Sequence, residues 1–209
     1  GDGDPLLTLR AEGLDVEGLD SSADMLSKLR DTAAERGVDV TVHHAAIELM
    51  DIGRAYRSIF LAGPTFNLIA DDATAVRALE RIRGHLDPAG AALVPLFIPE
   101  PVPDRQLGVV REHIEEGGRI LRVTATATER DEAARRQVTM LRYEVIDGGA
   151  RQVVERPWVQ HWHTQSGFGE LAAKAGLRVE AVMVADGSRA ALDATEFGFL
   201  LRRMDARAN

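Results

Sequence analysis

The stretch GLDSSADML, residues 18–26, indicates how this chain is organised. Residues 15–20 read as a short strand that ends at the acidic Asp20, and Ser21 or Ser22 can cap a helix directly after it. Met25 opens the apolar face of that helix, and Gly37 ends it. A strand that leads straight into an amphipathic helix is the repeating unit of a parallel α/β sheet.

The same alternation continues over the first 98 residues. Apolar stretches at residues 38–42, 57–62 and 91–98 predict further strands, the last one preceded by a turn at residues 87–90. Asp71 or Asp72 can cap another amphipathic helix. We therefore expect an α/β fold with a mainly parallel, Rossmann-like sheet.

The pattern changes after residue 98. Residues 119–128, 137–146 and 152–161 predict three strands of an antiparallel insertion, while the charge runs at 112–116 and 130–136 read as solvated faces. A helix capped by Thr164 or Ser166 follows, and then strands at 178–185 and 196–203. Their connection is too short for a helical crossover, so these last strands should pair antiparallel and make the sheet mixed.

Composition narrows the class of protein. The 209 residues and 45% hydrophobic content suit one domain with insertions, and the formal charge of −8 argues against nucleic acid as a partner. The sequence has no cysteine, which excludes disulfides and thiolate chemistry and suits the cytoplasm. An apolar stretch of membrane-spanning length is absent from the sequence, so no membrane partner is expected.

Three motifs carry a resemblance to a known family. Gly1 and Gly3 precede Asp20 by about the length of one helix and one strand. GLDSSADML, LDPAGA at residues 86–91 and AGL at residues 175–177 follow along the chain in the order of the similar motifs of one family. The chain resembles class I S-adenosylmethionine-dependent methyltransferases, in particular bacterial small-molecule enzymes such as amino-sugar and glycine N-methyltransferases. The resemblance implies a mixed seven-stranded sheet with an antiparallel last strand, and a first glycine and first strand upstream of Gly1.

The resemblance also implies an organisation in three parts and a cofactor, S-adenosyl-L-methionine. Residues 1–98 would be the cofactor-binding half, residues 99–163 the antiparallel β insertion that covers the acceptor or contacts a second subunit in a homodimer, and residues 164–209 the helix and β-hairpin that complete the core. Asp20 would accept hydrogen bonds from the ribose hydroxyls. The implied cofactor-binding residues are Gly1, Gly3, Asp20, Ser21, Met25, Ala46, Ile47, Leu61, Ala62 and Gly63.

A small-molecule acceptor would lie between the loop after the fourth family strand and the insertion. The expected acceptor-binding residues are Thr65, Phe66, Asn67, Trp158 and Trp162. Two alternatives remain open. Thr65 and Asn67 can belong to a capped loop without a ligand, and the inserted sheet with its tryptophans can simply pack on the core.

His161 and His163 are the candidate catalytic residues, one of them as a general base near neutral pH. Paired histidines can bind zinc, but no carboxylate or third histidine lies near them at ligand spacing, so no metal is expected.

The function implied is methyl transfer to a nitrogen or oxygen of a small molecule. One alternative is an NAD(P)-dependent oxidoreductase, which shares the glycine turn and the acidic strand end. It is less favoured because Leu6 occupies the third-glycine position of its fingerprint. A second alternative is a catalytically inactive, methyltransferase-like binding protein, since Ala46 lacks the acceptor side chain that often reads adenine in this family.

Overall fold

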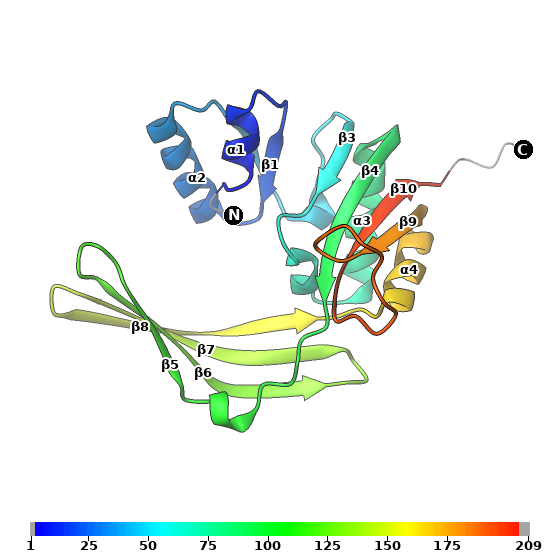
Figure 1. Ribbon diagram of the computed structural model, residues 1–209. Helices are drawn as coiled ribbons and strands as arrows, with labels where there is room; N and C mark the ends of the chain where they lie inside the picture. The colour runs from blue at the N-terminus through cyan, green and yellow to red at the C-terminus, as the bar shows by residue number, and fades with distance from the viewer. Residues whose placement is uncertain (1–2, 205–209) are drawn as a thin grey trace, which may run out of the picture.

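The computed structural model describes residues 3–204 (Figure 1). The first half contains α1 (Leu6–Ala11), β1 (Glu17–Asp20), α2 (Ala23–Arg36), β2 (Thr41–His44), η1 (Ile47–Leu49), β3 (Tyr56–Phe60), η2 (Thr65–Leu68), α3 (Asp72–His85) and β4 (Leu86–Phe97). The second half contains η3 (Asp104–Gln106), β5 (Val110–Ile114), β6 (Ile120–Asp131), β7 (Arg136–Asp147), β8 (Ala150–His161), α4 (Gln165–Lys174), β9 (Leu177–Met183) and β10 (Glu196–Arg203).

The three longer helices begin at side-chain caps that the sequence offered. Ser22 Oγ accepts from the Met25 N–H at 3.3 Å at the start of α2. Asp71 Oδ1 accepts from the Thr74 N–H at 2.7 Å at the start of α3, and Thr164 Oγ1 accepts a similar bond at the start of α4. Each cap satisfies a backbone donor that has no partner inside its helix.

The strands of the described residues form three sheets. β1 and β2 pair in parallel, and a second sheet has the order β3-β4-β10-β9, in which β3 and β4 are parallel and β10 is antiparallel to both neighbours. The inserted strands form an antiparallel sheet in the order β5-β6-β7-β8. The mixed α/β fold is therefore confirmed, whereas the strands expected in one seven-stranded sheet lie in two separate sheets.

Side chains link these two sheets where no strand ladder does. Glu17 of β1 accepts hydrogen bonds from the Tyr56 hydroxyl of β3 at 2.9 Å and from Arg54, and it pairs with His43 of β2 at 2.7 Å. The His43 contact is the main cause that lowers the pKa of Glu17, while burial and the Glu17 charge raise the pKa of Tyr56 to about 12. Both groups therefore keep the protonation states that this bond requires at neutral pH.

Three elements differ from the sequence expectation. β2 is formed by Thr41–His44, three residues further along the chain than the start of the strand expected at residues 38–42. β4 begins at Leu86, directly after α3, where residues 87–90 were expected to form a turn. Leu86 of β4 pairs with Tyr56 of β3. β4 can approach β3 closely at Gly90 because this residue has no side chain: a Cβ there would lie 2.8 Å from the Tyr56 carbonyl oxygen.

The inserted sheet also has a fourth strand, β5, which covers part of a stretch that we read as a charge run on a solvated face. All of β5 is exposed, and it is an edge strand of its sheet. Its Glu112 pairs with Arg122 of β6 at 2.7 Å.

The main hydrophobic core lies between the β3-β4-β10-β9 sheet and helices α3 and α4. Leu79 and Ile82 of α3 and Phe168 of α4 are fully buried, and the Phe168 and Phe199 rings lie 4.5 Å apart. Burial of each such side chain contributes roughly 1.5–3 kcal/mol. This core holds the carboxyl ends of β3 and β4 in fixed positions.

The arrangement of the elements places the inserted sheet at one edge of the core. Figure 1 shows the arrowheads of β1, β3 and β4 directed toward the β5–β8 sheet, which extends beyond the core beneath β1 and α2. In open α/β sheets, ligands bind outside the carboxyl ends of the parallel strands. Within residues 3–204, no helix has both the length and the apolar character that crossing a bilayer requires.

Candidate functional site

The carboxyl ends of β1 and β2 meet around Asp20. Its side chain accepts a hydrogen bond from the Ser22 N–H at 2.7 Å, and its carbonyl oxygen accepts one from the Ala45 N–H at 3.1 Å. His44 contacts the Ser21 carbonyl oxygen at 3.1 Å. These bonds bring Asp20 and Ser21 beside residues 44–46.

Gly3 shows why a glycine is needed before this edge. It is buried with φ +105°, and a Cβ at this position would lie 2.8 Å from Leu29 Cγ and 3.2 Å from Leu7 Cδ1. The backbone therefore packs against α2 at a distance that only glycine allows. Gly1, its predicted partner in the cofactor turn, lies outside the described residues.

The other predicted cofactor residues divide into core and surface positions. Ile47 and Leu61 are partly buried against the main core, and Met25 and Ala46 are also half-buried. Ala62 and Gly63 are exposed, and Gly63 has φ +91° with no atom near the place of a Cβ. The loop after β3 therefore presents backbone, not bulky side chains, at the carboxyl edge.

The predicted acceptor loop contains one exposed polar residue and two buried ones. Thr65 is exposed, while Phe66 and Asn67 are buried. Asn67 Nδ2 donates to the carbonyl oxygens of Phe97 at 2.8 Å and His161 at 3.3 Å, and Asn67 Oδ1 accepts from the Phe97 N–H at 3.2 Å. The Asn67 amide is thus bound to backbone at both of its atoms, which favours a structural role.

The two tryptophans have different surroundings. Trp158 of β8 is 43% exposed, and its cross-strand neighbour is Thr139, whose buried Oγ1 makes no hydrogen bond within the described residues. Trp162 is buried, and the Arg130 guanidinium carbon lies 4.1 Å from its ring centroid. Such a stacked arginine holds an aromatic ring in place. Trp158 is therefore the tryptophan that a ligand can contact.

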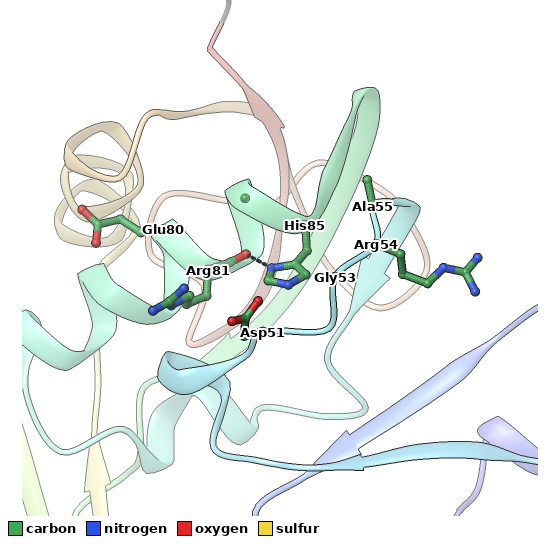
Figure 2. Close-up of a pocket in the computed structure, with 8 residues that line it drawn as sticks. Asp51, Gly53, Arg54, Ala55, Glu80, Arg81 and His85 are labelled. Carbon is green, nitrogen blue, oxygen red and sulfur yellow. Dashed lines mark hydrogen bonds between the residues drawn. The ribbon is translucent and has the colours of Figure 1, made fainter.

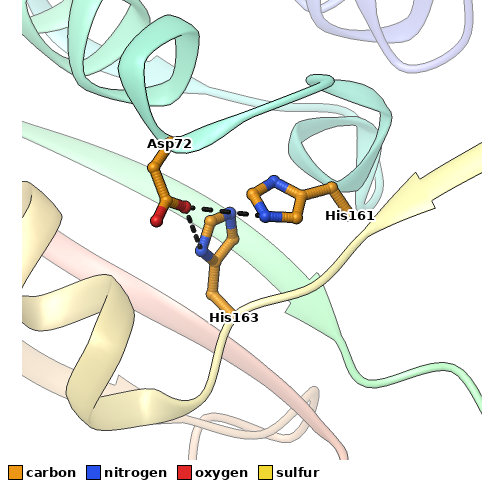
Figure 3. A group of neighbouring side chains, drawn as sticks. All are labelled: Asp72, His161 and His163. Atoms are coloured by element: carbon orange, nitrogen blue, oxygen red, sulfur yellow. Dashed lines mark ion pairs between the residues drawn. The ribbon is translucent and has the colours of Figure 1, made fainter. Parts of the chain in front are cut away.

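The two candidate catalytic histidines lie together. Their rings are 4.6 Å apart and edge to face, and both are buried. Asp72, the first residue of α3, lies beside them, with Oδ1 at 3.6 Å from His161 Nε2 and 3.7 Å from His163 Nδ1. Figure 3 shows the three side chains converging from α3, the end of β8 and the segment before α4.

Burial sets the charge of this pair. Loss of solvent lowers the pKa of His161 despite the opposing charge of Asp72, and it lowers the pKa of His163 to about 4. Both imidazoles are therefore neutral at pH 7, so each retains one nitrogen lone pair.

Sequence reasoning missed two members of this cluster. Arg135 donates to Asp72 Oδ2 at 2.6 Å and to His163 Nδ1 at 3.2 Å. We had assigned Arg135 to a solvated charge run and Asp72 to a helix cap. No spacing rule connects residues 63 positions apart, so only the folded chain shows their contact.

The cluster has the composition of a metal site. Asp72, His161 and His163 each offer a ligand atom within 4.8 Å of the others, a carboxylate and histidine set that suits zinc or iron. The Arg135 guanidinium, however, already supplies a positive charge in contact with Asp72 and His163. We therefore derive no metal chemistry from these residues.

A separate cavity of about 430 Å³ lies near the amino end of β3 and the last turn of α3, away from the carboxyl edge. Figure 2 shows His85 at its wall, between Arg81 and residues 51–55. His85 Nδ1 contacts the Arg81 carbonyl oxygen at 2.8 Å, and Nε2 accepts from the Ile52 N–H at 3.0 Å. Both ring nitrogens are thus bound to backbone, so this histidine joins α3 to the loop before β3.

Comparison with known proteins agrees with the α/β fold. A family model described as a methyltransferase domain matches residues 1–90. An S-adenosylmethionine-dependent methyltransferase from Clostridium acetobutylicum has a similar structure, with a TM-score of 0.78 at 12% identity over 98% of this chain and 81% of that one. The family match over residues 1–90 and the similar fold agree with the resemblance to class I S-adenosylmethionine-dependent methyltransferases found in the sequence.

Two more specific relatives carry amino-sugar names. The dTDP-3-amino-3,6-dideoxy-alpha-D-glucopyranose N,N-dimethyltransferase of Streptomyces fradiae is 30% identical over 127 residues, which are 60% of this chain and 48% of that protein. The chain thus aligns with about half the length of this curated relative. CalS10 of Micromonospora echinaspora, an amino pentose methyltransferase whose structure contains S-adenosylmethionine, has a TM-score of 0.66 at 21% identity over 97% of this chain and 80% of that one.

Proposed function

We propose that this protein transfers a methyl group from S-adenosyl-L-methionine to a nitrogen or oxygen of a small molecule, with the amine of an amino sugar as the first candidate acceptor. The observation that carries the proposal is the carboxyl edge itself, where Asp20 ends β1 within a region that matches a methyltransferase domain. The named activities of the relatives from Streptomyces and Micromonospora support the amine.

The residues of this edge suit the proposed cofactor. Hydrogen bonds to the Asp20 carboxylate, including the one from the Ser22 N–H, outweigh burial and keep the pKa of Asp20 below its usual range. An ionised carboxylate can accept from two ribose hydroxyls. The exposed backbone of Ala62 and Gly63 allows a ligand to approach the chain closely, and Ile47 offers an apolar surface.

Methyl transfer needs little chemistry from the protein. The sulfonium of the cofactor supplies an activated methyl group, and the protein has to orient the acceptor and exclude water. We propose that Thr65 and Trp158 contact the acceptor. The buried residues Phe66, Asn67 and Trp162 would hold the surrounding chain in place. His161, neutral at pH 7 and at the end of β8, is the better placed of the two candidate bases, and His163 is the more deeply buried.

The three-part organisation and the seven-stranded sheet belong to the same proposal. β1 and β3 each pair with one described strand only, and a further strand between these two edges would join both core sheets into one. Residues 99–163 would be the acceptor cover or the contact of a homodimer. Light scattering of the protein in solution tests the homodimer. A cytoplasmic location belongs to the same proposal.

Calorimetric titration tests the proposal. The protein should bind S-adenosylmethionine and S-adenosylhomocysteine saturably, Asp20→Ala should lose this binding, and Asp24→Ala, an exposed change in the same segment, should keep it. Binding of NAD alone would identify an oxidoreductase instead. Cofactor binding without turnover of amine and hydroxyl acceptors would identify an inactive binding protein.

A further inference from the structure

Arg135 occupies an unusual place in the chain. It ends the turn between β6 and β7 with φ +52°, the one non-glycine residue among those described with a positive φ. A side chain in this conformation costs on the order of 1–3 kcal/mol, which a glycine would avoid. The retained side chain therefore calls for a structural or functional reason.

The contacts of Arg135 supply that reason. Its carbonyl oxygen accepts from the Trp162 N–H at 2.9 Å, which fixes the segment just after β8. Its guanidinium donates to Asp72 on the core helix α3 at 2.6 Å and to His163 at 3.2 Å. One residue of the inserted sheet thus holds both the core and the chain segment that returns to the core.

The bond to His163 fixes the tautomer of this histidine. A guanidinium can only donate, so His163 Nδ1 must accept, and the ring proton must be on Nε2. The other groups around the ring are Asp72, His161, Phe66 and Phe168. His163 can take up a proton only by giving up Arg135.

Arg135 also lies where the sheet meets the proposed acceptor site. The next residue, Arg136, pairs with His161 across β7 and β8, and Thr139 pairs with Trp158 three residues further on. The register at the site end of these two strands is therefore set directly beside Arg135.

We propose that Arg135 is a positioning residue that clamps the inserted sheet to α3, so that the acceptor-binding side chains of the sheet stay over the carboxyl edge. This inference rests on the proposed methyltransferase function. Loss of the clamp should weaken acceptor binding and leave cofactor binding unchanged.

Steady-state kinetics of three variants test the clamp. Arg135→Met should raise the KM for the acceptor about tenfold, and Arg135→Lys, which keeps the charge but not the two-armed geometry, should recover part of this loss. The dissociation constant for S-adenosylhomocysteine should stay within about twofold of wild type in both variants, because the cofactor residues lie on other strands. Arg136→Met, an exposed change at the next position, is the control and should leave the acceptor KM unchanged.

A rise in the cofactor dissociation constant equal to that in the acceptor KM would overturn the proposal, and so would an unchanged acceptor KM in Arg135→Met. Failure of wild type to bind S-adenosylhomocysteine would reject the proposed function instead.

A measurement that needs no turnover separates the clamp further from the proposed function. ¹⁵N NMR of labelled imidazoles in the wild-type protein at pH 7 should show His163 as the single Nε2–H tautomer, and Arg135→Met should lose this uniformity. A protonated His163, or an Nδ1–H tautomer, in wild type would remove the clamp whatever the enzyme's substrate.

Discussion

At His163, the surroundings of one side chain make the stability of the fold depend on pH. The folded-state pKa of about 4 lies below the ordinary value of 6.5, so the unfolded chain binds a proton between these values while the folded chain does not. The stabilisation present above pH 6.5 is lost as the pH falls toward 4. Urea unfolding should show about 2 kcal/mol less stability at pH 5 than at pH 7.5 from this group alone.

His163→Phe is the variant that isolates this contribution. It keeps a ring against Phe66 and Phe168 but has no group to titrate, so its stability should fall less steeply over the same pH range than that of wild type. Equal slopes for both proteins would mean that folding does not lower the pKa of His163.

The neighbouring residues Thr65 and Asn67 should respond differently to truncation. Asn67→Ala removes the side-chain partner of the partly buried Phe97 N–H and should cost about 1–3 kcal/mol in thermal or urea unfolding. Thr65→Ala, at an exposed position, should change stability by less than about 0.5 kcal/mol while raising the acceptor KM. A large stability loss in Thr65→Ala would argue against a free acceptor-facing hydroxyl.

Single residues were predictable where their partners are near in sequence. Ser22, Asp71 and Thr164 cap helices through bonds to residues three positions away, so the local pattern contains both partners. Arg135 bonds to Asp72 across 63 residues, and nothing local to either residue indicates the other. Likewise, the sequence alone gave no reason to expect that the Asn67 amide binds the ends of two distant strands.

At the scale of elements, the junction of α3 and β4 offers a matched pair of glycines. Gly90→Ala places a Cβ 2.8 Å from the Tyr56 carbonyl oxygen, and we expect a loss of about 1–3 kcal/mol because backbone has to move. Gly84→Ala, near the end of α3 with no atom within 4 Å of its Cβ, should stabilise the protein by up to about 1 kcal/mol.

Chemical denaturation of both variants and wild type measures this difference. Equal effects of the two substitutions would mean that β3 and β4 do not approach each other as closely as the ladder between them requires.

Elements were predicted best where hydrophobic periodicity is strong. α2, α3 and α4 lie close to the expected residues, because burial on one face leaves a clear pattern. The long strands β6 to β8 also lie close to the expected residues. β5 was missed because an exposed edge strand has no buried face to record in its sequence. The early start of β4 was missed because LDPAGA has the composition of a turn.

At the scale of the whole molecule, ligand binding should stabilise the fold. S-adenosylhomocysteine at about 100 times its dissociation constant adds about 2.7 kcal/mol, which corresponds to about 5–10 °C in Tm for a domain of this size. Differential scanning fluorimetry should show this shift in wild type and in Asp24→Ala but not in Asp20→Ala. A shift of equal size in all three proteins would place the ligand away from Asp20.

The overall topology was predictable in part. The antiparallel pairing of β9 and β10 follows from a connection too short to cross the sheet, and the pairing of β1 with β2 follows from the helix between them. The division of the core strands into two sheets did not follow, because periodicity identifies a strand but not its neighbours.

The bonds of Asn67 bring the two ends of the inserted segment together. One side-chain nitrogen reaches both the last residue of β4, where the chain leaves the core, and the last residue of β8, where it returns. The segment between Phe97 and His161 therefore begins and ends within hydrogen-bond distance of the same side-chain amide. The length of the chain between Phe97 and His161 can therefore change without changing either bond of Asn67.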